Sequence, residues 1–247
     1  MQRVLSNVWY MVNDPGAFSA GALKMLATVP SDGVFAGDNL ITFGKNLSFL
    51  SSPKFMDALV RNQPDEAEVA CMWRKYVLCW AAKSSLRLEG DFVEAGTYRG
   101  HSAKMICDYV DFNTSGKAFY LYDLFEHDDA MPHHGMPAHG KDLYGKVVGR
   151  FAGYPGVHVV KGRVPDSFEG QEPERIAFLH VDLNNTEAEL GVLNRFFDRV
   201  VPGGIVIFDD YGWALYAQQK AAEDAWLAAR GHEPLELPTG QGLLIKR

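Results

Sequence analysis

From residue 91 onward the chain alternates short, largely apolar runs with segments that have helical composition. The apolar runs are residues 92–93, 118–122, 157–160, 176–181 and 205–208. Runs without polar alternation are typical of strands buried on both faces, and the intervening segments are long enough to carry helices. Repeated strand–helix units predict an α/β domain, with a mostly parallel sheet and helices on both of its faces.

The segments between and after these runs support the same prediction. A helix is expected from about Ser102 to Tyr109, and residues 187–200 have apolar side chains at helical spacing. Pro202-Gly203-Gly204 should end that second helix. A final helix is expected over 217–231, followed by a closing hairpin over 235–246.

Residues 1–90 lack this alternation. The periodic part is 53–88, where Pro64 separates two apolar helical faces, and residues 28–50 resemble a loop with at most one short strand. We therefore expect an N-terminal segment of helices and loops over 1–90 and the ligand-binding α/β domain over 91–247. The first segment could be a cap over a ligand site, or a plain packing or subunit-contact layer.

The charge balance and the cysteines limit the class of partner. Lys and Arg number 24 against 31 Asp and Glu, a net charge of −7, which disfavours nucleic acid or an anionic membrane as the main partner. The three cysteines have no C-x-x-C spacing, which indicates reduced thiols, and no apolar run approaches the length of a membrane span. We expect a cytoplasmic protein.

The turn after the first apolar run has the features of a ligand-binding strand-to-helix turn. Gly96 lets the backbone turn sharply and approach a ligand, and Gly100 should remove a Cβ where the next helix crosses the strand. Ser102 and the amides of the helix start would face an anion.

Acidic residues stand at the ends of four of the predicted strands: Glu94, Asp123, Asp182 and the pair Asp209-Asp210. The carboxyl ends of parallel strands meet at one edge of the sheet, where such domains bind ligands. Helix capping explains one such acid, but several carboxylates at one edge repel each other unless a cation lies among them.

Asp123 follows Glu94 by one strand–helix–strand unit, where an acid can accept hydrogen bonds from ribose hydroxyls. The turn itself reads Glu94-x-Gly96-x-x-x-Gly100 and lacks the G-x-G-x-x-G of dinucleotide sites. An acid at this position suits a ligand with an ammonium group. The pattern therefore favours S-adenosylmethionine (SAM) as cofactor.

Asp182, Asp209 and Asp210 form a set of hard oxygen ligands of the kind that Mg²⁺ or Ca²⁺ prefers, and Asn185 could add a carbonyl oxygen. Zinc would draw His or Cys, which are missing from those positions. A metal here would act as a Lewis acid on a hydroxyl pair of the substrate.

Residues 125–140 contain four of the eight histidines. This loop lacks the cysteines and regular spacing of a zinc site. It could be a mobile lid beside Asp123 with one histidine, such as His127, serving as a base, or simply a solvated polar loop.

Together these residues resemble the metal-dependent class I SAM O-methyltransferases. The phrases that carry the resemblance are Glu94–Ala103, Asp123, Asp182, Lys161–Phe168 and Val201–Gly212. They are similar to the macrocin O-methyltransferase (TylF/MycF-like) family, which methylates sugar hydroxyls, and more distantly to catechol O-methyltransferase. The likeness spans about residues 53–246.

The resemblance implies a Rossmann-like class I methyltransferase fold with a seven-stranded sheet. It implies Glu94, Tyr98 and Ser102 near the methionine end of SAM and Asp123 on the ribose. It also implies that Arg163 and Val164 flank the adenine and that Mg²⁺ lies on Asp182, Asp209 and Asp210.

Two departures concern the acceptor and the base. Asn185 stands where catechol-type enzymes carry a lysine base. The sugar-methylating family usually has Asp-Leu-Tyr in this region, where the chain has Asp182-Leu183-Asn184-Asn185.

These observations predict a SAM- and Mg²⁺-dependent O-methyltransferase for a vicinal diol, with a sugar of a glycoside or natural product as the expected acceptor. Asp182 and His127 are the predicted catalytic residues. A catechol-type acceptor is the nearest alternative. A dinucleotide-dependent oxidoreductase and a non-catalytic binding protein are the alternatives from other classes. The apolar helical residues before Asp91 also predict a homo-oligomer.

Overall fold

The computed structural model describes residues 2–127 and 135–247. These residues form two compact units, Met1–Val77 and Leu78–Arg247, and the boundary lies within one helix. We describe each unit by itself. In the described part of the chain, no helix combines the length and apolar character that crossing a bilayer requires.

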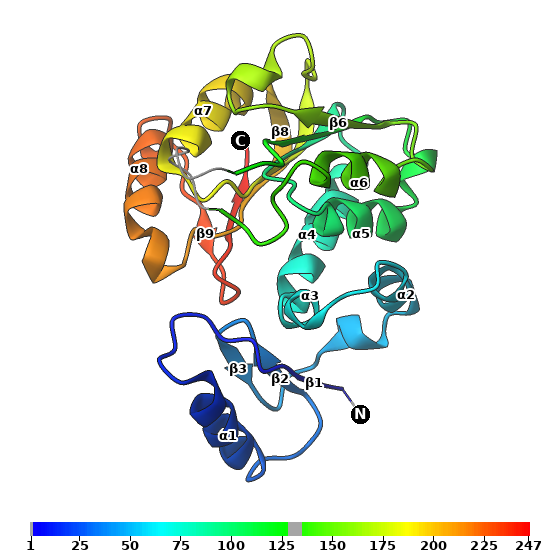
Figure 1. Cartoon of the computed structure of the whole chain (residues 1–247). Coiled ribbons are helices and arrows are strands. Elements are labelled where there is room, and N and C mark those ends of the chain that lie inside the picture. The colour runs from blue at the N-terminus through cyan, green and yellow to red at the C-terminus, as the bar shows by residue number, and fades with distance from the viewer. Residues whose placement is uncertain (1, 128–134) are drawn as a thin grey trace. The chain divides into compact units, whose positions relative to one another are not determined.

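The first unit contains a small sheet, with one helix between its first two strands in the sequence and further helices after its third strand (Figure 1). Its elements are β1 (Arg3–Leu5), α1 (Pro15–Leu26), β2 (Val34–Gly37), β3 (Leu40–Thr42), η1 (Ser48–Ser51), α2 (Pro53–Arg61), α3 (Glu66–Ala70) and the start of α4 (Met72–Ser85). The prediction of helices and loops over 1–90 was therefore wrong in missing a three-stranded sheet of order β1-β2-β3.

The signal for this sheet is a two-residue hairpin turn. Asp38 and Asn39 both have left-handed φ angles, 52° and 57°, which suit the tight turn between β2 and β3. Arg74 holds the turn with a forked contact to Asp38, at 2.6 and 2.8 Å. Strands of three or four residues are too short for their periodicity to stand out in a sequence.

The expected boundary at 90/91 differs from the one between the two units, at Val77/Leu78. The second half of α4 belongs to the second unit, where Lys83 lies 5.9 Å from the ring centroid of Tyr109. A continuous helix crosses the boundary, so no break in the sequence pattern marks it.

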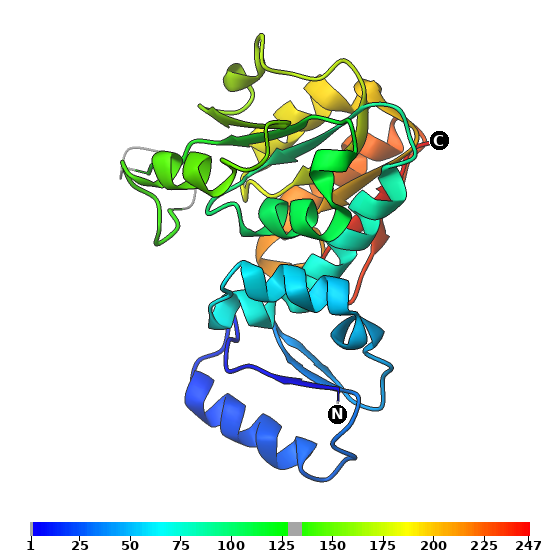
Figure 2. The same cartoon turned by 90° about the vertical axis from the view of Figure 1, so that its right-hand side faces the viewer.

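The second unit is a seven-stranded sheet between two layers of helices (Figures 1 and 2). Its strands are β4 (Asp91–Ala95), β5 (Phe119–Asp123), β6 (Val157–Lys161), β7 (Ile176–Val181), β8 (Val200–Phe208), β9 (Leu235–Glu236) and β10 (Gly242–Ile245). Its helices, besides the end of α4, are α5 (His101–Val110), η2 (Phe112–Thr114), α6 (Leu143–Arg150), η3 (Asp166–Phe168), α7 (Thr186–Phe196), η4 (Phe197–Arg199), η5 (Ala214–Tyr216) and α8 (Ala217–Ala228).

The strand order is β6-β5-β4-β7-β8-β10-β9, with β10 antiparallel to β8 and to β9. This confirms the predicted α/β fold, the mostly parallel sheet and the closing hairpin. The chain leaves β4 toward β5 on one side, and β7 returns on the other. The crevice outside the carboxyl ends of β4 and β7 is therefore the topological switch point, where open α/β sheets bind ligands.

The two faces of the sheet bury different cores. Val93, Leu179 and Val181 pack with Phe196 and Leu227 of α7 and α8. On the opposite face Phe92 contacts the rings of Phe112, Phe119 and Phe178 at centroid distances of 5.4 to 5.7 Å. Alternate residues of β4 and β7 thus point to opposite layers, which directs Glu94 and His180 to the side opposite α7 and α8.

One boundary differs from the prediction. β8 begins at Val200 and includes Pro202-Gly203-Gly204, which we expected to lie before the strand. The register shifts between Ile176 and Phe178 of the partner strand, and Pro202 and Gly203 are exposed. A bulged strand end tolerates Pro and Gly, because those residues need not join the ladder.

Candidate cofactor and metal site

The turn after β4 brings two strand ends into close contact. Gly96 has a φ of 97°, and a Cβ at this position would lie 1.7 Å from the carbonyl oxygen of Asp182. No other residue fits. The amide of Asp182 donates to the carbonyl of Ala95 (2.8 Å), so the ends of β4 and β7 are held side by side.

Gly100 has a different role from the one predicted. It is the N-cap of α5 with a φ of 71°, and its Cβ position faces the ring of Phe151 at 3.0 Å rather than a strand. Ser102 is the second residue of α5 and is half-buried, so it lies at the helix start as predicted.

Asp123 ends β5 and is buried, with a fixed carboxylate. Its Oδ2 accepts from the amide of Tyr98 and its Oδ1 from the amide of Phe125, both at 2.6 Å. Tyr98 holds a left-handed φ of 46° in this arrangement. The two backbone amides fix the orientation of the carboxylate.

The described end of the predicted lid lies against Tyr98 and Asp123. The amide of Ala138 donates to the Tyr98 hydroxyl (2.8 Å), and the Nε2 of His139 is 4.0 Å from Asp123 Oδ1. The His139 ring meets the Tyr98 ring edge-on at 5.4 Å. His127 stacks on His139 with ring centroids 6.4 Å apart. Sequence reasoning chose His127 and missed His139, while His133 and His134 lie outside the described residues.

His180 joins two acids that the sequence assigned to different ligands. Its Nδ1 is 2.9 Å from Glu94 Oε2, and its Nε2 is 3.5 Å from Asp209 Oδ1. Glu94 and His180 are a cross-strand pair of β4 and β7, and both are fully buried. Burial raises the pKa of Glu94, against the lowering effect of His180. Burial opposes a charge on His180, but the neighbouring carboxylates of Asp209 and Glu94 raise its pKa to about 10.

His180, Asp182 and Asp209 offer ligand atoms that all lie within 4.8 Å of one another. The predicted set was Asp182, Asp209 and Asp210, so the geometry adds His180 to two of its members. Gln241 Nε2 donates to Asp209 Oδ1 at 2.8 Å. The signal for His180 was present as a histidine within the otherwise apolar run 176–181, whereas Gln241 had none.

Asn185 caps α7, and its side-chain oxygen accepts from the amide of Ala188 (2.9 Å). That contact explains the residue without the metal contact we considered. The loop before it is held by Glu189, which accepts from the amides of Leu183 (3.0 Å) and Asn184 (3.2 Å). The position of Asp182 therefore depends on α7.

Arg163 and Val164 follow β6 and have different surroundings. Arg163 is exposed, whereas Val164 is buried in the core that includes Phe168 and Phe196. The peptide bond between Val164 and Pro165 is cis.

Comparison with known proteins identifies the fold. Residues 93–211 match a family described as a methyltransferase domain, Methyltransf_24. No curated protein matches the chain. Among solved structures, the O-methyltransferase NovP aligns with a TM-score of 0.62 at 17% identity, covering 77% of this chain and 87% of NovP. The fold is that of a class I methyltransferase.

Two further methyltransferase structures are similar to the chain. The TDP-rhamnose 3'-O-methyltransferase CalS11 aligns with a TM-score of 0.54 at 16% identity, covering 78% of this chain and 95% of CalS11. The SAH-bound methyltransferase PaMTH1 from Podospora anserina aligns with a TM-score of 0.52 at 13% identity, covering 97% of this chain and 98% of PaMTH1. SAH is the product that SAM leaves after methyl transfer.

Within this methyltransferase fold, the residues at the switch point fit a SAM-type ligand. Gly96 lets the backbone pass where a side chain would collide. Glu94 Oε1 is buried and makes no hydrogen bond to the described residues, so it can accept one from an ammonium group. The Asp123 carboxylate keeps further lone pairs for ribose hydroxyls beyond its two amide contacts.

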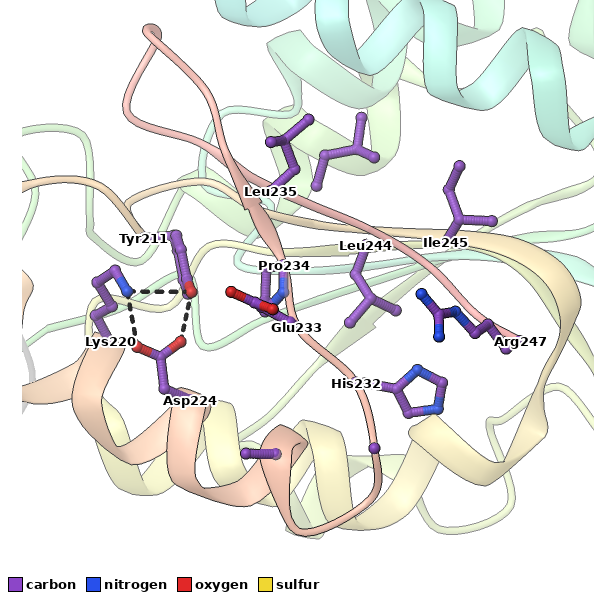
Figure 3. A pocket seen from close by; sticks show the side chains of 13 residues that line it. Tyr211, Lys220, Asp224, His232, Glu233, Pro234, Leu235, Leu244, Ile245 and Arg247 are labelled. Carbon is purple, nitrogen blue, oxygen red and sulfur yellow. Dashed lines mark hydrogen bonds and ion pairs between the residues drawn. The ribbon is translucent and has the colours of Figure 1, made fainter.

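A cavity of about 1040 Å³ lies elsewhere in the methyltransferase unit, between α8 and the C-terminal hairpin (Figure 3). Lys220 donates to Tyr211 (3.1 Å) and to Asp224 (2.7 Å), and Tyr211 donates to Asp224. Burial and the Asp224 contact raise the pKa of Tyr211 to about 12. None of the predicted cofactor or metal residues lines this cavity, so its size does not identify the cofactor site.

Proposed function

We propose that the protein is a SAM-dependent O-methyltransferase that uses a divalent metal and methylates one hydroxyl of a vicinal diol. The observation that carries the proposal is the meeting of three features at one switch point. They are the Gly96 turn, the oriented carboxylate of Asp123, and the group formed by His180, Asp182 and Asp209.

Each feature has a role in this reaction. Glu94 would bind the ammonium group and Asp123 the ribose of SAM, which supplies an electrophilic methyl group for an acceptor oxygen. Asp182 and Asp209 would hold a divalent metal next to the acceptor, and Asp210 would complete the set. A metal there lowers the pKa of a bound hydroxyl. Most of the rate enhancement would come from holding the reacting atoms in line.

The acceptor proton must leave the site. His127 was predicted as the base, and His139 is the second candidate, because its ring lies beside Asp123 and Tyr98. Replacing each histidine by Asn separates the two roles: loss of turnover with unchanged SAM affinity would mark the base.

A sugar diol is the acceptor we propose. Support comes from CalS11, a TDP-rhamnose 3'-O-methyltransferase with a similar structure, and from the TylF/MycF-like phrases of the sequence. We also propose that the protein is a cytoplasmic homo-oligomer whose main partner is neither nucleic acid nor a membrane.

The test is calorimetric titration of SAM into metal-stripped protein, followed by a panel of acceptors with Mg²⁺. Formation of SAH with glycoside diols supports the proposal. Formation of SAH with catechols alone would mean that the acceptor is an aromatic diol and not a sugar. Binding of NAD without binding of SAM would overturn the proposal and favour an oxidoreductase.

Asp209→Asn tests the metal role. We expect it to abolish SAH formation and to leave SAM affinity within about threefold, because the metal acts on the acceptor. Asp198→Asn is the control, since Asp198 is exposed on η4. Equal loss of SAM binding and turnover would contradict the metal role, provided that the thermal midpoint is unchanged.

A further inference from the structure

His180 is a buried polar residue in a strand that is otherwise apolar. It is 1% exposed, and β7 is buried along its whole length. Each of its ring nitrogens faces a carboxylate, Nδ1 toward Glu94 and Nε2 toward Asp209. A histidine that serves only to pack a strand needs neither contact.

The Nδ1 side is a hydrogen bond. At 2.9 Å, Nδ1 lies within hydrogen-bond distance of Glu94 Oε2 and donates to it, which leaves Nε2 as the ring nitrogen that can bind a metal. A carboxylate that accepts from one ring nitrogen while the other faces a metal is the usual surrounding of a metal-binding histidine, because it sets the tautomer and the ring orientation.

The distance between His180 Nε2 and Asp209 Oδ1 suits two ligands of one metal ion. At 3.5 Å, this distance is long for a hydrogen bond. Two ligands at about 2.1 Å from a tetrahedral Zn²⁺ lie roughly 3.4 Å apart. The nitrogen is buried and makes no hydrogen bond to any described residue, and it faces the Asp182–Asp209 pair.

We propose that His180 is a metal ligand through Nε2, with Asp182 and Asp209 as its oxygen partners and Glu94 as the residue that orients its ring. The centre is then a His–Asp–Asp site for a divalent transition metal such as Mn²⁺, Co²⁺ or Zn²⁺, in place of an all-oxygen Mg²⁺ site. This proposal rests on the proposed function in one respect: both place a divalent metal on Asp182 and Asp209.

The chemistry of the ligands separates the two kinds of centre. Mg²⁺ prefers oxygen ligands and retains water, whereas an imidazole nitrogen suits Mn²⁺, Co²⁺ and Zn²⁺. Transition metals bind most sites more tightly than Mg²⁺ does, so the informative quantity is the ratio of Co²⁺ to Mg²⁺ affinity with and without the histidine.

The first experiment asks whether nitrogen is bound. Metal-stripped full-length protein is loaded with Mn²⁺, and electron spin-echo spectroscopy detects coupling to an imidazole nitrogen. We expect this coupling in the wild type and its loss in His180→Asn. His158→Asn is the matched control, because it removes an exposed histidine from β6 of the same sheet. Absence of nitrogen coupling in the wild type would overturn the proposal, and so would its survival in folded His180→Asn.

The second experiment measures affinity by titration with Co²⁺ and Mg²⁺. His180→Asn should lower the Co²⁺ to Mg²⁺ affinity ratio at least about tenfold. Glu94→Gln should weaken Co²⁺ binding by about 10- to 100-fold, while the loaded fraction keeps its nitrogen coupling. A Co²⁺ affinity unchanged in both variants would contradict the proposal. If His180→Asn does not fold, the wild-type spectrum and Glu94→Gln still decide.

SAM titration of the same samples separates this inference from the proposed function. SAM binding and methyl transfer without nitrogen coupling would show that His180 is not a metal ligand, while supporting the methyltransferase function. Nitrogen coupling without SAM binding would support His180 as a metal ligand and contradict the methyltransferase function.

Discussion

At the scale of the residue, the site depends on a few positions that only one type of residue can fill. Gly96 is the clearest, because both its φ of 97° and the Asp182 carbonyl exclude a side chain. His180 is the second, because its contacts join the predicted cofactor acid Glu94 to the predicted metal acid Asp209.

Gly96→Ala should separate the ends of β4 and β7 or prevent folding. A Cβ 1.7 Å from a carbonyl oxygen requires backbone movement, and we expect a loss of unfolding free energy above about 3 kcal/mol. Urea denaturation measures it. Gly116→Ala is the control: its φ is 69°, but no atom of the described residues lies within 4 Å of the added Cβ, so it should lose only about 1–2 kcal/mol. Equal losses would show that the φ angle alone matters.

At the scale of the element, two contacts outside the strands position the site. The segment around Ala138 and His139 is attached to the Tyr98 hydroxyl, and the loop 183–185 is attached to α7 through Glu189. Glu189 also forms a buried carboxyl pair with Glu223 of α8.

Tyr98→Phe should loosen the segment over Asp123. It removes the acceptor for the Ala138 amide, a bond worth about 1 kcal/mol, and exchange of that amide should accelerate about fivefold. Hydrogen exchange followed by mass spectrometry measures this change. Tyr144→Phe is the control, since the Tyr144 ring contacts Phe125 and keeps that contact when its hydroxyl is removed. Unchanged exchange would mean that other contacts hold the segment.

The Glu189–Glu223 pair predicts a pH dependence. Burial raises the pKa of both carboxyls, so the folded state retains a proton that the unfolded state releases above about pH 4.3. Stability from this pair is complete below that pH and is lost as the pH rises through the folded-state pKa, by up to about 1.4 kcal/mol per pH unit. Asp224 and Lys220 of α8 act on Glu223 in opposite directions.

Glu223→Gln should remove this loss, because an amide can donate to Glu189 without titrating. We expect the variant to be more stable than the wild type at pH 8 and to have a flatter profile between pH 5 and 8. Urea denaturation across this range measures it. Glu187→Gln, at an exposed position in the first turn of α7, should keep the wild-type profile. A steeper profile in Glu223→Gln would contradict the retention of a proton by the folded pair.

At the scale of the whole molecule, the sheet order creates the site. β4 and β7 are distant in sequence but adjacent in the sheet, and the order reverses between them. Five acids separated by up to 116 positions, from Glu94 to Asp210, lie at or just after the ends of strands whose carboxyl ends meet at one edge.

Binding at this edge should stabilise the fold. SAM at 100 times its dissociation constant should add about 2.7 kcal/mol to the unfolding free energy, or about 5–10 °C to the thermal midpoint. NAD at the same concentration should leave the midpoint unchanged. Asp123→Asn should lose the increase in thermal midpoint that SAM gives. The single side-chain oxygen of Asn cannot accept hydrogen bonds from the backbone N–H groups of Tyr98 and Phe125 and also from two ribose hydroxyls. A shift with NAD alone would contradict the cofactor assignment.

The sequence by itself determined the class of fold. Buried parallel strands must be apolar on both faces, so the runs at 118–122 and 176–181 were visible as strands, and the acids that follow them lay at strand ends by necessity. The need for a glycine at position 96 was also predictable, because a tight turn after a strand is a local feature of the sequence. The strands of the first unit were not predictable, because strands of three or four residues are too short to show a periodicity.

Only the tertiary structure decided how the acids are partnered. The Glu94–His180 contact depends on the register of β4 against β7, and the Gln241–Asp209 contact depends on the hairpin returning beside β8. Register is a property of two strands together, so no single stretch of sequence records it. The same holds for His139, which reaches Asp123 because the segment around Ala138 is attached to Tyr98.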